Sequence, residues 1–173
     1  MRAVLIYTVF LGLIIFSGCT LDGSKTSGSS GIRMTTLELR DYQTSTFETN
    51  DLNTVTKVIL DVLRDDGFVI GAYDRDLGII NASKIVNYDN REAEREAFKE
   101  FGVDLKADKR ITVEFNATVT PFGMSSKVRT GFRINIVRKS GQVKNTAVVT
   151  QPEYYRNFFR KVQKGLFLEA QHL

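Results

Sequence analysis

Two neighbouring stretches near the middle of the chain alternate between apolar and polar residues, and this alternation constrains the fold more than any other feature. Every second residue is apolar over residues 111–120, and the same holds over residues 128–136 apart from Thr130. Side chains of a β-strand point alternately to the two faces of its sheet, so each stretch predicts a strand with one buried face and one face in water. Residues 121–124 contain proline and glycine, which favour a turn. We therefore expect a long antiparallel hairpin.

The polar side of the second stretch carries three cations. Lys127, Arg129 and Arg133 fall on the face away from the predicted core, because they alternate with the apolar positions. Such a basic stripe is commonly a solvated face whose charges also keep strand edges from pairing with other chains. The alternative is contact with an anionic lipid, a glycan or an acidic partner. These three residues are the candidate anionic contact site.

Helical periodicity predicts two long helices. Apolar residues recur at i, i+3, i+4 and i+7 between residues 51 and 66, and Gly67 supplies a stop. Residues 150–153 have a capping-box pattern with proline in the first turn, and they open a long C-terminal helix. Gly165 is expected to weaken that helix by up to about 1 kcal/mol relative to alanine. The aromatic residues of this helix exceed one stripe, which leaves a surplus ring for a partner or a lipid tail.

The remaining segments complete the expected fold. Residues 32–49 show no helical period and predict one or two strands, residues 68–86 a β-hairpin, and residues 143–149 a short strand. Residues 91–101 predict a short charged helix capped by Asn90. Strands and helices outside strict βαβ alternation predict an α+β domain, with an antiparallel sheet and helices packed on one face.

The N-terminus has the order of a secretory signal. Arg2 is followed by a mostly apolar run over residues 3–16 and by the tripeptide Ser17-Gly18-Cys19. A transmembrane anchor needs about 20 apolar residues and this run is shorter. The ending resembles the bacterial lipobox, which implies cleavage after Gly18 and attachment of diacylglycerol, and often a further acyl chain such as palmitate, at Cys19.

These assignments divide the chain into three parts. Residues 1–18 are the expected signal peptide, residues 19–31 a lipidated cysteine with a Gly/Ser-rich tether, and residues 32–173 one α+β domain. A flexible tether of this length has a root-mean-square reach of roughly 20 Å. We expect an outer-membrane anchor with the domain in the periplasm, while the inner membrane and the cell surface remain open.

The counts of reactive residues argue against an enzyme. The chain has one cysteine, Cys19, and one histidine, His172, which lies at a terminus that tends to fray. A Ser-His-Asp triad and a Cys/His zinc site are therefore not expected, and we assign no catalytic residue, metal or cofactor. The excess of 24 Lys and Arg over 20 Asp and Glu is too small to indicate nucleic-acid binding.

Four acidic residues could still serve a hydrolase. Asp65, Asp66, Asp74 and Asp76 lie close in sequence, and a pair of carboxylates is sufficient for glycoside hydrolysis. The first two lie at the expected end of a helix and the others in a hairpin turn, where aspartate commonly binds backbone N–H groups. We expect these turn and terminus roles.

Several segments resemble a family of small bacterial lipoproteins from Gram-negative envelopes that has no assigned activity. The matching segments are Arg40-Asp-Tyr-Gln-Thr, Phe47-Glu-Thr-Asn-Asp51, Asp65-Asp-Gly-Phe-Val-Ile70, Leu77-Gly-Ile-Ile80, Ala82-Ser-Lys84, Tyr155-Arg-Asn-Phe-Phe159 and Phe167-Leu-Glu-Ala-Gln171. The order of helix, Gly-Phe hairpin and Leu-Gly turn is also similar, more distantly, to the helix-grip lipoprotein of the β-barrel assembly machinery. The resemblance implies an envelope protein and gives no catalytic residue to carry over.

The sequence thus favours a non-enzymatic accessory or adaptor in an envelope complex. Its expected partners are the membrane, through the lipid anchor, and an envelope protein. A module that binds a lipid or another amphiphile between the sheet and the aromatic helix is the alternative, and a hydrolase that uses the acidic residues is the third.

Overall fold

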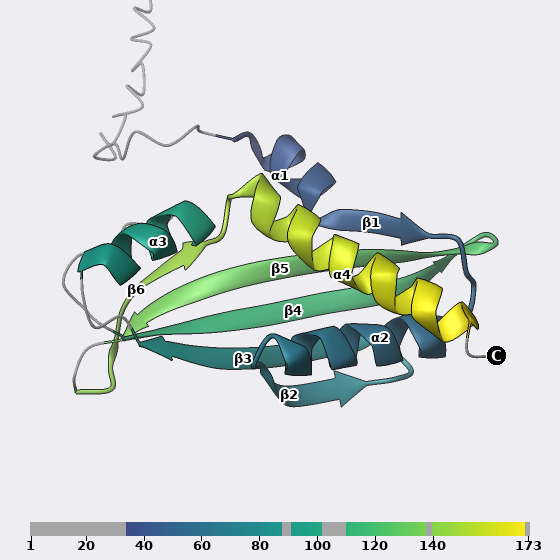
Figure 1. Ribbon diagram of the computed structural model, residues 1–173, viewed down its shortest axis with the longest axis horizontal. Helices are drawn as coiled ribbons and strands as arrows, with labels where there is room; N and C mark the ends of the chain where they lie inside the picture. The colour runs from purple at the N-terminus through teal and green to yellow at the C-terminus, as the bar shows by residue number, and fades with distance from the viewer. Residues whose placement is uncertain (1–33, 88–90, 102–109, 138–139, 172–173) are drawn as a thin grey trace, which may run out of the picture. The chain divides into compact units, whose positions relative to one another are not determined.

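The computed structural model describes residues 34–87, 91–101, 110–137 and 140–171 (Figure 1). The segment from Gly31 to Leu173 forms one compact unit. The expected signal peptide, Cys19 and the tether lie outside the described residues, as do Asn90 and His172. Within the described part of the chain, no helix is long and apolar enough to cross a membrane.

The domain is an α+β fold, as predicted. One sheet of six strands has the order β1-β5-β4-β3-β2, with β6 also paired to β5, and every pairing is antiparallel. Helices α2 and α4 lie together across one face of the sheet (Figure 1). The elements are α1 (Thr36–Tyr42), β1 (Thr44–Phe47), α2 (Leu52–Asp65), β2 (Val69–Asp74), β3 (Ile79–Asn87), α3 (Arg91–Phe101), β4 (Arg110–Phe122), β5 (Ser125–Val137), β6 (Val143–Val148) and α4 (Pro152–Gln171).

The central hairpin is formed by β4 and β5, and its burial follows the predicted alternation. The pairing continues from Ile111 opposite Ile136 to Phe122 opposite Ser125, around a turn in which Gly123 has a φ of 62°. Every second residue on these strands is buried against the helices. Phe132 lies at the centre of an aromatic cluster, with ring centroids 4.7 to 6.4 Å from five other rings. The core therefore lies between this hairpin and α4.

The prediction of strands throughout residues 32–49 is wrong for the first half of that segment. Residues 36–42 form α1, and only β1 is a strand. The Thr35 hydroxyl accepts the Glu38 N–H at 3.2 Å, and the Glu38 carboxylate accepts the Thr35 N–H at 2.7 Å. This capping box stabilises the first turn of a helix whose apolar residues are too few to show a period. It also holds the pKa of Glu38 below its usual value, first through the backbone hydrogen bond.

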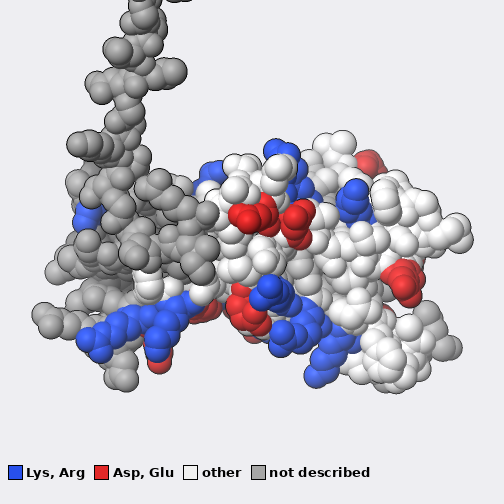
Figure 2. All heavy atoms as spheres, turned by 90° about the horizontal axis from the view of Figure 1, so that it is seen from above, with Lys and Arg blue, Asp and Glu red and all other residues white. Residues whose placement is uncertain are grey.

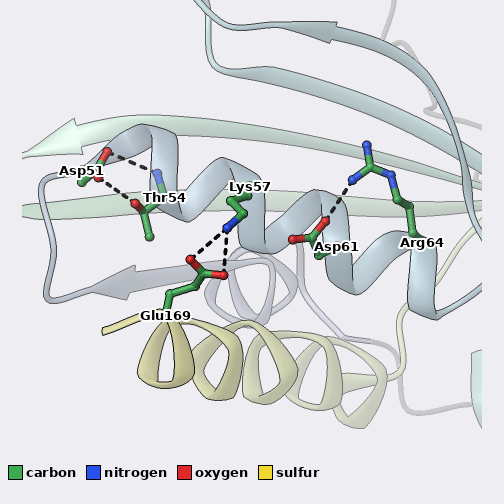
Figure 3. Close-up of polar contacts among 6 residues, drawn as sticks. All are labelled: Asp51, Thr54, Lys57, Asp61, Arg64 and Glu169. Atoms are coloured by element: carbon green, nitrogen blue, oxygen red, sulfur yellow. Dashed lines mark hydrogen bonds and ion pairs between the residues drawn. The ribbon is translucent and has the colours of Figure 1, made fainter. Parts of the chain in front are cut away.

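Helices α2 and α4 approach closely because Gly165 has no side chain. A Cβ atom added at Gly165 would lie 2.5 Å from Cγ1 of Val58, which is itself buried. Gly165, which was expected to weaken α4, therefore allows α2 to pack closely against it. An exposed ion pair between Lys57 and Glu169, with an N–O distance of 3.0 Å, joins the same helices near the end of α4 (Figure 3). Exposed pairs of this kind contribute about 0–1 kcal/mol, so the packing matters more.

Helix α2 begins where the sequence predicts. Its N-cap Asp51 accepts the Asn53 N–H at 3.0 Å. It also accepts the N–H and the hydroxyl of Thr54, at 3.2 and 2.7 Å (Figure 3). These bonds satisfy N–H groups that have no partner within the helix. The hydrogen bonds from Thr54 are the main reason that the pKa of Asp51 is lowered.

Candidate functional site

The outer edge of β5 is shared by two short strands that leave a gap between them. Strand β1 pairs with residues 126–129 of β5, and β6 pairs with residues 133–137. At the two borders of the gap, the Thr130 N–H donates to the Gln43 carbonyl at 2.8 Å and the Val149 N–H donates to the Phe132 carbonyl at 3.0 Å. The sheet is therefore interrupted near Gly131.

The hydroxyl of Tyr155 closes this gap from the helix side. It donates to the Val149 carbonyl at 2.8 Å and accepts from the Gln43 side-chain amide at 3.3 Å. The Tyr155 side chain is fully buried. Burial raises the pKa of Tyr155, while the hydrogen bond from Gln43 acts in the opposite direction. One hydroxyl thus joins the segments on both sides of the gap.

A groove of about 330 Å³ lies at the same place and reaches the open face of the sheet. We call it the Gly131 groove. Asn116 and Thr118 of β4 line it together with Arg129 and Arg133 of β5. Gln43 and Val148 line it from the two edge segments.

The absence of a side chain at Gly131 keeps this groove open. Gly131 lies opposite Asn116 in the β4–β5 register. A Cβ atom added there would lie 2.9 Å from the Asn116 Oδ1 atom. Any larger residue would therefore displace the Asn116 amide and fill part of the groove.

The structure brings two of the three predicted cations together at this groove. Arg129 and Arg133 are both exposed, and no ion pair or hydrogen bond to either guanidinium occurs among the described residues. Glu114, the cross-strand neighbour of Arg133, accepts a 2.6 Å hydrogen bond from the Asn135 amide. Both arginines are therefore available to an anionic ligand.

The third predicted cation points elsewhere. The Lys127 ammonium lies 4.3 Å from the centroid of the Phe122 ring, near the tip of the β4–β5 hairpin, and Lys127 does not line the Gly131 groove. This cation–π contact is a sufficient partner for an ammonium at a partly exposed site. The predicted stripe is thus divided into an arginine pair and a separate lysine.

A second pocket of about 330 Å³ lies on the helix side of the sheet, beside α4. Its aromatic lining was not predicted as a cavity from the sequence, because it consists of core residues whose periodicity indicates packing alone. The aromatic residues are Phe68, Phe132, Tyr154 and Phe158. They come from three separate segments, since Tyr154 and Phe158 share α4, and only the tertiary fold brings these segments together.

Charged side chains surround this second pocket. Lys161 and Asp66 form an ion pair, and the Lys84 ammonium lies 4.8 Å from the centroid of the Phe68 ring. Glu100 of α3 also lines the pocket, and loss of water around its carboxylate raises its pKa although the residue as a whole is exposed. Lys and Arg atoms gather along the side of the molecule where α3 and α4 lie, with acidic atoms among them (Figure 2). The rim therefore carries both signs of charge.

Two of the four acidic residues considered for hydrolysis, Asp66 and Asp74, have structural partners. Asp74 accepts the N–H groups of Asp76 and Leu77, each at 3.0 Å, which confirms its predicted turn role. Asp66 caps α2 and pairs with Lys161, while Asp65 and Asp76 are exposed. Among the described residues, no group of three or more His, Cys, Asp or Glu side chains is placed to hold a metal ion.

Several solved structures are similar to this chain. No protein-family model and no curated protein matches the chain. A DUF4468 family protein from Bacteroides ovatus ATCC 8483 is similar over 71% of this chain and 84% of its own, with 14% identity and a TM-score of 0.40. A TBP-like protein from Parabacteroides distasonis ATCC 8503 is similar over 71% of this chain and 90% of its own, with 10% identity and a TM-score of 0.38. The resemblance to small lipoproteins stays a prediction.

Proposed function

We propose that this chain is a non-enzymatic lipoprotein that is anchored through Cys19 in the outer membrane and acts in the periplasm as an accessory or adaptor of an envelope complex. The open face of the sheet is the observation that carries the proposal. Residues of β4 and β5 that point away from the helices are exposed or half-buried, and this face presents the arginine pair of the Gly131 groove. A polar face with unpaired cations is suited to an acidic partner.

The N-terminal sequence supports a position near a membrane. The lipobox-like ending implies that Cys19 carries acyl chains. Each CH₂ group of such a chain that is buried in the bilayer contributes about 0.8 kcal/mol to membrane binding. Thr20 resembles the residue that follows the cysteine in outer-membrane lipoproteins of enterobacteria. The resemblance to small Gram-negative lipoproteins is consistent with the same location.

Crosslinking in the native envelope tests the adaptor role. The full-length lipoprotein is crosslinked in cells, and attached proteins are identified by mass spectrometry. We expect a reproducible envelope partner that is lost from the variant carrying Arg129→Glu and Arg133→Glu. The matched control carries Arg160→Glu and Lys164→Glu, which make the same charge change on α4 and should retain the partner. Recovery of the lone lipoprotein from wild-type cells would refute the adaptor role.

The second pocket favours a second candidate, a module that binds a lipid or another amphiphile. Four aromatic residues and a charged rim provide the apolar surface and the polar groups that small-molecule sites combine. Native mass spectrometry of the full-length chain, released gently from membranes, is the test. We expect a retained amphiphile that is lost when Asn157→Trp fills the pocket. A wild-type chain that carries no ligand beyond its own acyl groups would exclude this candidate.

A further inference from the structure

We propose that the Gly131 groove binds a phosphoryl group, which Arg129 and Arg133 clamp from opposite sides. This inference goes beyond the adaptor role and does not depend on it. It rests on the unpaired guanidinium groups, the space over Gly131 and the number of hydrogen-bond donors that meet there.

The two arginines are spaced so that they can hold one ligand. They lie on the same face of β5, four residues apart, which separates their Cα atoms by about 13 Å. Gly131 lies midway between them and has no side chain to fill the space. Arginine side chains are long enough for both guanidinium groups to reach a group bound over Gly131.

The charge of the groove requires an anion. Each guanidinium keeps its positive charge at all relevant pH values and presents five N–H donors. Within the described residues neither arginine has a protein partner, and the carboxylate of Glu114 is engaged by Asn135. A ligand that brings two negative charges would balance the arginine pair.

The number of donors favours a phosphoryl group over a carboxylate. One arginine can satisfy both oxygens of a carboxylate through a bidentate pair. The groove offers two such groups, together with the hydroxyl of Thr118 and the side-chain amide of Asn116. A phosphate monoester carries about −1.5 to −2 charges at pH 7 and three acceptor oxygens, so it can use both arginines.

The wall of the groove is held in place before any ligand binds. The side-chain amide of Gln43 donates to the buried Tyr155 hydroxyl at 3.3 Å, which fixes this residue at the border of the gap. Asn116 lies against Gly131 on the neighbouring strand. A site whose walls are already ordered loses less conformational freedom when it binds.

Equilibrium dialysis of the full-length chain in phosphatidylcholine vesicles tests the site, with radiolabelled inorganic phosphate as the probe. We expect Arg129→Gln or Arg133→Gln to weaken phosphate binding about 10- to 100-fold, the range for a lost hydrogen bond to a charged group. Acetate at equal ionic strength should compete poorly. The double variant Arg160→Gln with Lys164→Gln should bind phosphate like the wild type, because it changes charge on α4 alone.

One further variant keeps the result interpretable. Gly131→Ala fills the groove without removing charge, and we expect it to weaken phosphate binding while thermal unfolding stays close to that of the wild type. Three results would overturn the proposal. The wild type could fail to bind phosphate, both arginine variants could bind phosphate as tightly as the wild type, or the α4 control could lose as much binding as the arginine variants.

The lipid composition of the vesicles identifies the source of the phosphoryl group. Phosphatidic acid carries a phosphomonoester, whereas phosphatidylglycerol carries a diester and controls for surface charge. Displacement of bound phosphate by phosphatidic acid alone would assign the groove to a lipid headgroup. Unchanged phosphate binding in both vesicles would assign it to a soluble phosphate.

Discussion

Replacing Tyr155 by phenylalanine tests whether one hydroxyl closes the gap between β1 and β6. The substitution keeps the buried ring and removes the oxygen that contacts Gln43 and Val149. The expected effect is a loss of stability without a change of fold, because the ring continues to pack against Phe132.

The magnitude follows from the groups that lose their partner. A buried polar group left unsatisfied costs about 1–3 kcal/mol. The buried Val149 carbonyl loses its hydrogen bond, whereas Gln43 is half-buried and can bind water instead. We expect Tyr155→Phe to lower the free energy of unfolding by about 1–3 kcal/mol.

Urea unfolding at equal m-values measures this difference. Tyr73→Phe removes a hydroxyl from an exposed position on β2 and is the control, with an expected change within about 0.5 kcal/mol. A loss below about 0.5 kcal/mol for Tyr155→Phe would refute the argument that the hydroxyl satisfies a buried backbone carbonyl.

The same substitution has a pH dependence of known sign. Burial raises the pKa of Tyr155 in the folded chain, whereas an unfolded tyrosine titrates near pH 10. Above about pH 10, Tyr155 loses its proton in the unfolded state and keeps it in the folded state. The stability that the protonated hydroxyl contributes is therefore complete below about pH 10 and falls as pH rises toward the pKa of the folded state. The stability difference between wild type and Tyr155→Phe should therefore shrink above about pH 10, as measured by urea unfolding at a series of pH values.

Three other substitutions give distinct expectations. Gly165→Ala should lower stability by about 1–2 kcal/mol in urea unfolding, because the cost of overpacking against Val58 exceeds the gain of about 1 kcal/mol in helix propensity. A more stable variant would contradict this, and a double-mutant cycle with Val58→Ala should show that the smaller side chain relieves the overpacking. Gly78→Ala should lower the free energy of unfolding by more than about 3 kcal/mol in the same assay, since its Cβ would lie 2.2 Å from the Val119 carbonyl oxygen and φ is +63°. A urea midpoint near that of the wild type would be incompatible with that contact. Glu100→Gln should raise stability at pH 7 and lose this advantage as pH falls below the raised pKa of Glu100, because the protonated wild-type carboxyl no longer carries a desolvated charge. Thermal unfolding at several pH values measures the stability difference between the two chains, and a difference that does not change with pH would exclude the mechanism.

Periodicity was sufficient to predict most of the elements. The alternation in β4 and β5 and the helical pattern of α2 place their apolar residues in the core as expected. The aromatic surplus of α4 is also found, since Tyr155 and Phe158 are buried while Phe167 is 58% exposed. Repeated local patterns of this kind are visible in a single sequence because each element must bury one face.

Features that depend on few residues or on distant contacts could not be predicted in this way. The helix α1 has only a capping box between Thr35 and Glu38 to signal it, and attention to that spacing would have found it. The basic residues Arg129 and Arg133 were identified, but the groove between them depends on the places where β1 and β6 end along β5. Sequence pattern carries no information about such an interruption.

The gap in the sheet edge also affects the order in which the chain can fold. Strands β4 and β5 are adjacent in sequence and joined by a tight turn, so their contacts close a short loop. Strand β1 instead pairs with β5, which lies far from it in sequence. The hydrogen bond between Gln43 and Tyr155 joins residues 112 positions apart. Contacts between distant segments form more slowly because loop closure costs entropy before the contact is gained. Strand β1 precedes β5 in the chain and stays unpaired until β5 has formed, and the Gly131 groove is complete only when the last helix docks.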